Sequence, residues 1–141
     1  MFRYLNHRFH RNNISFQIPD GYYLDSDPEM PDKNTIWLAS PRLDFHISIT
    51  VLTGGEDTFS ALSDSITDMM PKCISPIEPI SINGLRGHHA SYRLTRSQYY
   101  EVFLDLGHGE LLNIVMWGTD DSIYARTTAT ITALDLRCEE K

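Results

Sequence analysis

The side chains best suited to chemistry in this chain are two histidines and one aspartate. If the strands that carry them adjoin, His46, His89 and Asp105 would supply the imidazole and carboxylate ligands that suit Zn²⁺ or Mn²⁺. His88 cannot join His89 on the same ion, because neighbouring residues of a strand point to opposite faces of the sheet. The simpler interpretation is a hydrogen bond between strands on a solvated face, as expected for a cluster without a motif. A small metal-dependent hydrolase that uses His46, His89 and Asp105 is therefore an alternative function, not the first.

Other candidate motifs lack essential residues. The acidic loop 25–29 has the alternating acids of a calcium loop, but Met30 replaces the glycine that such a loop needs. Gly54-Gly55 precedes a helix as in phosphate-binding loops, but the acids Glu56 and Asp57 follow, and no Gly-Lys-Ser/Thr does. No G-x-S-x-G, S-x-x-K or H-E-x-x-H motif is present. We therefore expect a protein without a cofactor, and the sequence favours a non-catalytic role over an enzymatic one.

Charge and cysteine content restrict the possible partners and compartments. Lys and Arg total 12 against 19 Asp and Glu, so that the net charge is −7, which disfavours binding to nucleic acid. The two cysteines, Cys73 and Cys138, are widely separated and predict neither a disulfide framework nor a thiolate metal site. No apolar run approaches the roughly 18 residues of a membrane span, and no signal-peptide segment is present. We expect a cytoplasmic protein that does not insert into a membrane.

The first 13 residues differ from this acidic average. They contain Arg3, Arg8 and Arg11 and no acid. The usual position for such arginines is the exposed face of an edge strand. The alternative is that Arg3, Arg8 and Arg11 contact an acidic partner.

Hydrophobic periodicity predicts which elements position these residues. Surrounding turn signals predict strands over 3–9 and 14–18, and two further strands are expected over 35–39 and 45–52, the second with a clear period-two pattern. After Gly54-Gly55 the period becomes helical, and we expect a helix that Asp57 caps and Pro71 ends. Its apolar stripe consists of Phe59, Leu62, Ile66, Met69 and Met70.

The pattern of residues 77–117 predicts a meander of antiparallel strands. Asn83-Gly84 and His108-Gly109 are typical of tight hairpin turns. A looser turn centred on Ser97 would place Arg93 opposite Glu101 and His89 opposite Asp105. The face that these pairs share would also carry the apolar side chains of Tyr99, Phe103, Leu112, Ile114 and Met116.

A sheet that is apolar on both faces needs a cover on both. The segment 123–136 follows a potential cap at Asp120-Asp121-Ser122 and has an apolar stripe of helical period, although its threonines would also suit a strand. We expect it to form a second helix. The predicted fold class is α+β, a single domain over 1–141 in which a central antiparallel β-sheet has helices packed on it as an α/β/α sandwich.

This order of elements resembles the PsbP/Mog-like fold superfamily, which includes small uncharacterised bacterial members. The resemblance covers nearly the whole chain and depends on the turn in 16–22, Phe-Gln-Ile-Pro-Asp-Gly-Tyr, and on Ile82-Asn83-Gly84 before a strand that contains Tyr92. It implies a central antiparallel sheet between helices. In characterised relatives this fold mainly binds other proteins, a small GTPase in one branch and photosystem subunits in another.

Four apolar side chains of the meander are candidates for a contact surface. Tyr99, Phe103, Ile114 and Met116, with Trp117 as a further candidate, belong to residue types that are common at protein interfaces, although burial under the terminal helix is the more usual position for such large side chains. We expect a non-catalytic protein-binding or accessory domain that contacts a protein partner through these residues or through the basic N-terminal hairpin.

A small-ligand carrier that uses the cleft between sheet and helix is a further alternative. A homodimer would form if one sheet face lacked a cover.

Overall fold

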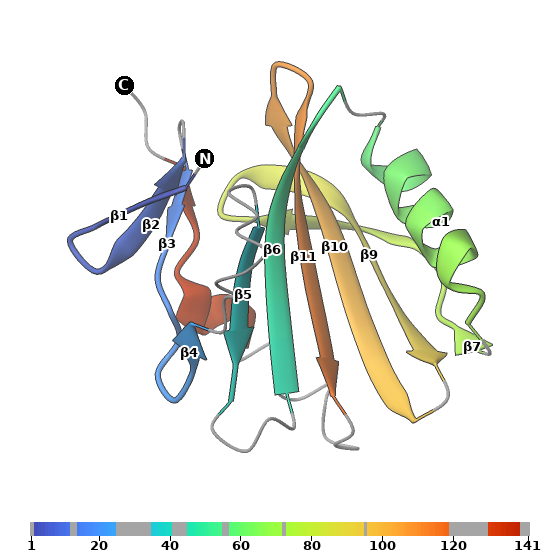
Figure 1. The fold of residues 1–141 in the computed structure, drawn as a ribbon. Coiled ribbons are helices and arrows are strands. Elements are labelled where there is room, and N and C mark those ends of the chain that lie inside the picture. The colour runs from blue at the N-terminus through green and yellow to red at the C-terminus, as the bar shows by residue number, and fades with distance from the viewer. Residues whose placement is uncertain are drawn as a thin grey trace.

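The computed structural model contains two antiparallel sheets (Figure 1). The larger sheet has the order β4-β5-β6-β11-β10-β9-β7, and β8 also pairs with β9; the smaller has the order β1-β2-β3-β12. The structure describes residues 2–11, 14–24, 35–40, 45–54, 57–71, 73–94, 96–118 and 130–138. The strands of the larger sheet are β4 (Tyr23–Leu24), β5 (Thr35–Ala39), β6 (Phe45–Thr53), β7 (Cys73–Ile74), β8 (Glu78–Ile82), β9 (Leu85–Leu94), β10 (Ser97–Gly107) and β11 (Glu110–Gly118). Those of the smaller are β1 (Arg3–Leu5), β2 (Arg8–Arg11), β3 (Ile14–Phe16) and β12 (Arg137–Cys138).

The helix α1 (Thr58–Met69) has the position that periodicity predicted. Asp57 caps it, since its Oδ1 accepts a hydrogen bond from the backbone N–H of Ser60 at 2.9 Å. The helix ends at Met70, which has the left-handed φ of 50°, and Pro71 follows. Leu62 and Ile66 are buried in a cluster with Ala90, Tyr92, Phe103 and Leu111 of the sheet. We call the sheet face under this helix the α1 face.

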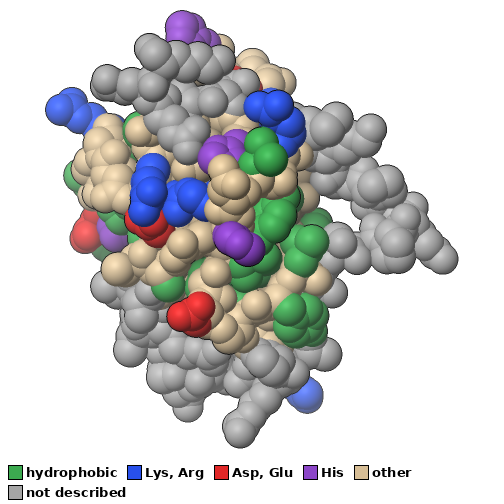
Figure 2. Space-filling model, turned by 90° about the vertical axis from the view of Figure 1, so that its left-hand side faces the viewer, with side chains coloured by type: hydrophobic (Ala, Val, Ile, Leu, Met, Phe, Trp, Pro, Cys, Tyr) green, Lys and Arg blue, Asp and Glu red, His purple; other side chains and the backbone are tan. Residues whose placement is uncertain are grey.

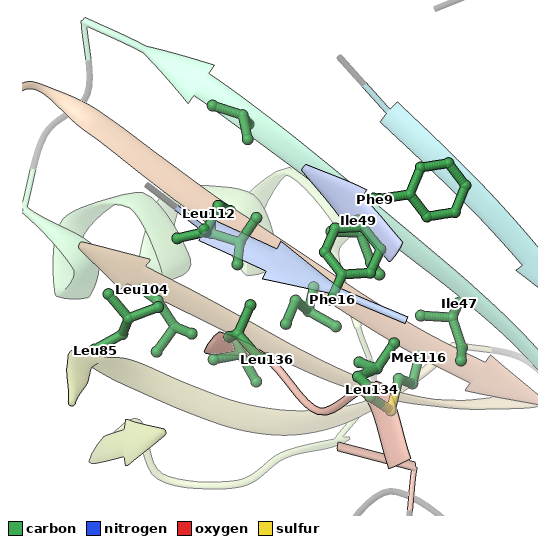
Figure 3. Packing of buried hydrophobic residues seen from close by; sticks show 14 of the residues in the cluster. Phe9, Phe16, Ile47, Ile49, Leu85, Leu104, Leu112, Met116, Leu134 and Leu136 are labelled. Atoms are coloured by element: carbon green, nitrogen blue, oxygen red, sulfur yellow. The ribbon is translucent and has the colours of Figure 1, made fainter. Parts of the chain in front are cut away.

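The opposite face of the larger sheet, which we call the hairpin face, has a different cover. Alternate residues of β6, from Phe45 to Val51, are buried there, as their period-two pattern predicted. Figure 3 shows side chains of the N-terminal strands and of the C-terminal segment packed against those of the central strands. The covering residues are Phe9, Phe16, Leu134 and Leu136, and they pack with Ile47, Ile49, Leu112 and Met116 among others.

The expected second helix is therefore confirmed only in part. Residues 130–134 are helical, Asp135 has a left-handed φ of 47°, and the chain then continues to β12. Residues 119–129, with the expected cap and most of the apolar stripe, lie outside the described residues. The central antiparallel sheet is as predicted. The expected α/β/α sandwich is shown only in part: α1 packs on one face of the sheet, and within the described residues the hairpin face is covered by the smaller sheet together with the short helical segment 130–134.

The N-terminal region contains one turn more than predicted. The single strand expected over 3–9 is itself a hairpin, because Asn6 and His7 adopt left-handed φ values of 54° and 63° and separate β1 from β2. At Asn83-Gly84 and His108-Gly109 both residues have positive φ, as a type I′ hairpin turn requires, and these two predictions are confirmed.

The register of the β9–β10 hairpin differs from the prediction. Leu94 pairs with Ser97, so that His89 pairs with Val102 and not with Asp105, and Glu101 pairs with Ala90 and not with Arg93. The difference of three positions (105 − 102) is odd, and an odd shift exchanges the faces on which paired side chains lie. Tyr99 and Phe103 therefore lie on the α1 face, opposite Trp117 and Asn113 of β11.

Candidate functional site

The three residues of the predicted metal site do not meet. His46 lies on the α1 face, where its ring stacks on Trp117 with 5.3 Å between centroids. His89 lies on the hairpin face, where its Nδ1 and the Tyr100 hydroxyl are 2.7 Å apart in a hydrogen bond. Within the described ranges no group of three or more His, Cys, Asp or Glu side chains could hold a metal ion. The site expected from His46, His89 and Asp105 is thus corrected, because two of its ligands lie on opposite sides of the sheet.

The environments of His89 and Tyr100 are consistent with a structural role. Burial lowers the pKa of His89 below its usual value, and His88 acts in the same direction while Glu78 opposes it. Burial also raises the pKa of Tyr100 to about 12. Both shifts favour the neutral forms, so the pair is an uncharged hydrogen bond within the protein.

The four apolar residues of the predicted contact surface do not share one surface. Ile114 and Met116 are buried on the hairpin face, and Phe103 is buried beneath α1. Only Tyr99 remains partly accessible, on the α1 face. For the other three, burial is the correct interpretation, and the surface expected from Tyr99, Phe103, Ile114 and Met116 is corrected accordingly.

Two of the three N-terminal arginines make contacts within the molecule. Arg8 donates to Asp135 Oδ2 at 2.9 Å and to Ser15 Oγ at 3.1 Å. Arg11 forms an ion pair with Glu110 of the larger sheet at 3.1 Å, whereas Arg3 is exposed on β1. Figure 2, which views the molecule from this side, shows basic side chains near the centre beside an acidic one. Arg8 and Arg11 therefore connect the smaller sheet to the rest of the molecule.

A row of aromatic rings crosses the α1 face, and we call it the aromatic strip. It starts at Trp37 on β5, continues through Trp117 on β11 and Tyr99 on β10, and ends at Tyr92 on β9; His46 stacks on Trp117 from β6. The centroids of successive rings are 6.1, 6.0 and 5.2 Å apart. Rings at these separations attract one another and restrict each other's motion. The strip is therefore a fixed surface that five strands support.

Exposure changes along the strip. Tyr92 is 3% exposed under α1, whereas Trp37 is 42% exposed. The helix packs on β9 and β10 and leaves the rings on β5 and β11 less covered. Sequence reasoning named Tyr99 and Trp117 as contact candidates but missed the strip and Trp37, because the two Trp residues are 80 positions apart and only the pairing β5-β6-β11 brings them together. The sequence did contain one signal for the site: in strands that are otherwise apolar, both Trp residues occupy positions that point away from the hairpin face.

A buried carboxylate lies next to the covered end of the strip. Glu101 is 2% exposed, and its Oε1 accepts a hydrogen bond from the Tyr92 hydroxyl at 2.8 Å. Its Oε2 accepts from the Ser65 hydroxyl at 2.8 Å and from the Asn113 amide at 3.0 Å. Burial, followed by the charge of Glu101, raises the pKa of Tyr92 far above its usual value. The network joins α1 to three strands and holds Tyr92 in its protonated form.

A pocket of about 540 Å³ opens at the other end of the α1 face. The Thr58 hydroxyl and His88 Nδ1 form a 2.7 Å hydrogen bond there, and the Phe59 ring packs nearly perpendicular to the imidazole with 5.5 Å between centroids. The lining residues are Asp57, Thr58, Pro79, Ile80, Ser81, Arg86, Gly87, His88 and Asp105. This is the cleft between sheet and helix in which a small ligand was expected. Its charged groups are of both signs, so its chemistry selects no single class of ligand.

Comparison with known proteins shows a likeness of structure. No protein-family model and no curated protein matches the sequence. The Ran-binding protein Mog1p of Saccharomyces cerevisiae aligns over 93% of this chain and 82% of its own, with a TM-score of 0.58 and 10% identity. A point variant of Mog1 aligns over 93% and 83%, with a TM-score of 0.58 and 9% identity. A protein from Bacteroides thetaiotaomicron aligns over 91% of this chain but 46% of its own, with a TM-score of 0.54 and 10% identity.

These likenesses confirm the PsbP/Mog-like fold that the sequence predicted, and at such low identity they show the fold alone. Among the helices of the described ranges, none is sufficiently long and apolar to cross a membrane.

Proposed function

We propose that this protein, which has the PsbP/Mog-like fold, is a non-catalytic binding module that holds another protein against the Trp37 end of the aromatic strip. The observation that carries the proposal is the gradient of exposure along the strip, from 3% at Tyr92 to 42% at Trp37. Trp and Tyr are the side chains that most often dominate the binding energy of protein interfaces.

The rings of the strip are also preorganised for binding. Trp117 stacks on Tyr99 and His46 and touches Trp37 edge-on. A ring that is already fixed loses little conformational entropy when a partner covers it. The Glu101 network fixes Tyr92 at the covered end of the strip. The partner therefore finds a surface whose shape changes little on binding.

The likeness to Mog1p supports the class of function only. Mog1p is a Ran-binding protein with this fold, so the fold is one on which a protein-binding surface has been built. We transfer protein binding to this chain and not Ran, because 10% identity carries no contact residue across. We place the module in the cytoplasm, since Cys73 and Cys138 are free and exposed, as reducing conditions allow.

The experiment that tests the proposal uses Trp37→Ala and a matched exposed aromatic, Tyr4→Ala, on the distant strand β1. Each variant and the wild type capture protein from an extract of the source organism. We expect one stoichiometric partner with the wild type and with Tyr4→Ala, and at least a tenfold loss with Trp37→Ala. Because both tryptophans of the chain belong to the strip, the purified partner should also change the tryptophan emission. Equal capture by all three proteins would contradict the proposal.

A second copy of the chain is the alternative occupant of the same surface. Sedimentation equilibrium at increasing concentration distinguishes it from a foreign partner. A dimer that Trp37→Ala dissociates and Tyr4→Ala does not would assign the strip to self-association.

A small-ligand carrier is the second candidate function. It is favoured by the pocket of about 540 Å³ beneath the start of α1, a volume typical of ligand sites. Mass spectrometry of the native protein should then reveal an added small molecule that denaturation releases. Asp105→Leu, which fills the pocket from β10, should abolish the adduct.

A further inference from the structure

We propose that the aromatic strip also transfers single electrons within the molecule, from the buried Tyr92 to the exposed Trp37, with Glu101 as the acceptor of the phenol proton. The co-reactant is a one-electron oxidant, such as a small inorganic radical or an oxidised metal complex, that meets the strip at its exposed end. This activity goes beyond the function proposed above and requires no protein partner.

The rings of the strip form a continuous path for an electron. Tyr92 and Tyr99 are stacked with 5.2 Å between centroids and 6° between ring planes, and Tyr99 and Trp117 with 6.0 Å and 8°. Trp37 meets Trp117 at 6.1 Å. Electron tunnelling falls steeply with separation, so rings in contact exchange an electron much faster than rings that lie apart. The path joins a ring that is 42% exposed, Trp37, to one that is 3% exposed, Tyr92.

The buried end of the path has a base within hydrogen-bond reach. The Tyr92 hydroxyl donates to Glu101 Oε1 at 2.8 Å. Burial and the charge of Glu101 raise the pKa of Tyr92, so this phenol carries its proton before it is oxidised. An oxidised phenol is a very strong acid, and its proton therefore crosses to the carboxylate as the electron leaves. Of the two phenols in the strip, it is Tyr92 that donates to a carboxylate within the described ranges.

The products of this step contain one buried charge less than the reactants. The oxidant gains one electron, the O–H bond of Tyr92 breaks, and an O–H bond forms at Glu101 Oε1. A neutral phenoxyl radical and a neutral carboxylic acid result, and loss of the charge on a carboxylate that is 2% exposed favours them. Ser65 and Asn113 donate to the other oxygen, Oε2, so their hydrogen bonds need not break. One electron from a reductant such as ascorbate returns the proton to Tyr92.

Pulse radiolysis of the purified protein tests the inference. Azide radicals preferentially oxidise tryptophan, and the resulting indolyl radicals absorb at wavelengths distinct from those of phenoxyl radicals. We expect the indolyl band to decay as the phenoxyl band grows, at a rate that does not depend on protein concentration. Tyr92→Phe keeps the ring but removes the hydroxyl, and should abolish this transfer. Glu101→Gln should slow it about tenfold or more, because an amide is a poor proton acceptor.

Two tryptophan variants test the path. Trp117→Phe should slow the transfer about tenfold or more, because the remaining indole, Trp37, then lies outside the stack. Trp37→Ala leaves Trp117 stacked on Tyr99 and should leave the rate unchanged. The same Trp37→Ala variant should lose the protein partner of the proposed function, so failure of one proposal is distinguishable from failure of the other.

The matched control is Tyr100→Phe, which removes a hydrogen-bonded hydroxyl from the hairpin face, outside the strip. It should leave the rate unchanged. Thermal unfolding shows which variants are folded, and Tyr92→Phe together with Trp117→Phe keeps the test decisive if Glu101→Gln does not fold. The inference would be overturned if the indolyl band decayed without growth of the phenoxyl band. Transfer at the wild-type rate in Tyr92→Phe, in Trp117→Phe or in folded Glu101→Gln would also overturn it.

Discussion

Individual side chains on the α1 face show how a buried acid is accommodated. Glu101 has no cation among its hydrogen-bond donors in the described part of the chain, and receives bonds from a phenol, a hydroxyl and an amide. Neutral donors can satisfy a buried carboxylate if every lone pair that is removed from water finds a partner. Because these donors come from β9, α1 and β11, the acid determines where the helix lies beside the aromatic strip. In the resting protein its role is thus positional.

Tyr100 leads to a prediction about alkaline pH. Burial raises its pKa from the usual 10 to about 12, so the folded protein holds this proton more tightly than the unfolded chain does. The resulting stabilisation is complete below pH 10 and is lost as the pH rises toward 12. We expect the free energy of unfolding of Tyr100→Phe, measured by urea titration, to decline less steeply than that of the wild type across this interval. Tyr4→Phe, at an exposed position, should retain the wild-type slope.

Among the elements, the central hairpin β9–β10 decides which residues share the candidate site. Its tight connection makes Leu94 pair with Ser97 and puts Tyr99, Glu101, Phe103 and Asp105 in a line along the α1 face. That line runs from the aromatic strip, past the Glu101 network and beneath α1, to the pocket. A change of one residue in this turn would move all four side chains to the other face.

Gly87 carries a prediction for the same hairpin. A Cβ at this position of β9 would lie 1.7 Å from the carbonyl oxygen of Phe103 on β10, so that the two strands could not keep their spacing. We expect Gly87→Ala to lower the free energy of unfolding by about 3 kcal/mol or more. Thermal and urea unfolding measure the loss. Ser81→Ala, on the exposed edge strand β8, is the control and should change stability by less than about 0.5 kcal/mol.

In the whole molecule, two sheets enclose the core of the hairpin face. The ion pair of Arg11 with Glu110 connects the two sheets, and further polar contacts hold the C-terminal segment beside the smaller sheet. Arg8 joins β2 to Asp135, while the backbone N–H of Gln17 donates to the carbonyl of Leu134 at 2.8 Å. The side chains of Arg137 and Arg8 lower the pKa of Asp135. The two ends of the described chain are therefore held together on one side of the larger sheet (Figure 1).

Arg8→Ala should loosen this connection without unfolding the larger sheet. We expect the amide of Gln17 to exchange with solvent about tenfold faster, while amides in the centres of β10 and β11 retain their protection. Hydrogen exchange followed by NMR measures both. Arg3→Ala removes an exposed arginine from the neighbouring strand and should leave the exchange of Gln17 unchanged. Equal acceleration in the two variants would mean that Arg8 does not hold the C-terminal segment in place.

The sequence by itself determined whatever depends on neighbours along the chain. The alternation in 45–52, the cap at Asp57 and the positive-φ turn at Asn83-Gly84 are local, so the strand, the helix and the hairpin could be predicted. The order of these elements sufficed for the fold. It also sufficed to exclude known catalytic motifs, although not to identify a binding surface.

Only the tertiary structure decided which distant residues meet. Trp37 and Trp117 touch because β5, β6 and β11 are neighbours in the sheet, and His46 and His89 are separated because their strands present them on opposite faces. The N-terminal strands cover the hairpin face. This could not be predicted, because the turn at Asn6-His7 that separates two of them has no strong local signal. Strand order and register are set by packing across the whole sheet, and a shift of one residue exchanges the faces. For this physical reason the aromatic strip and the Glu101 network could be found only in three dimensions.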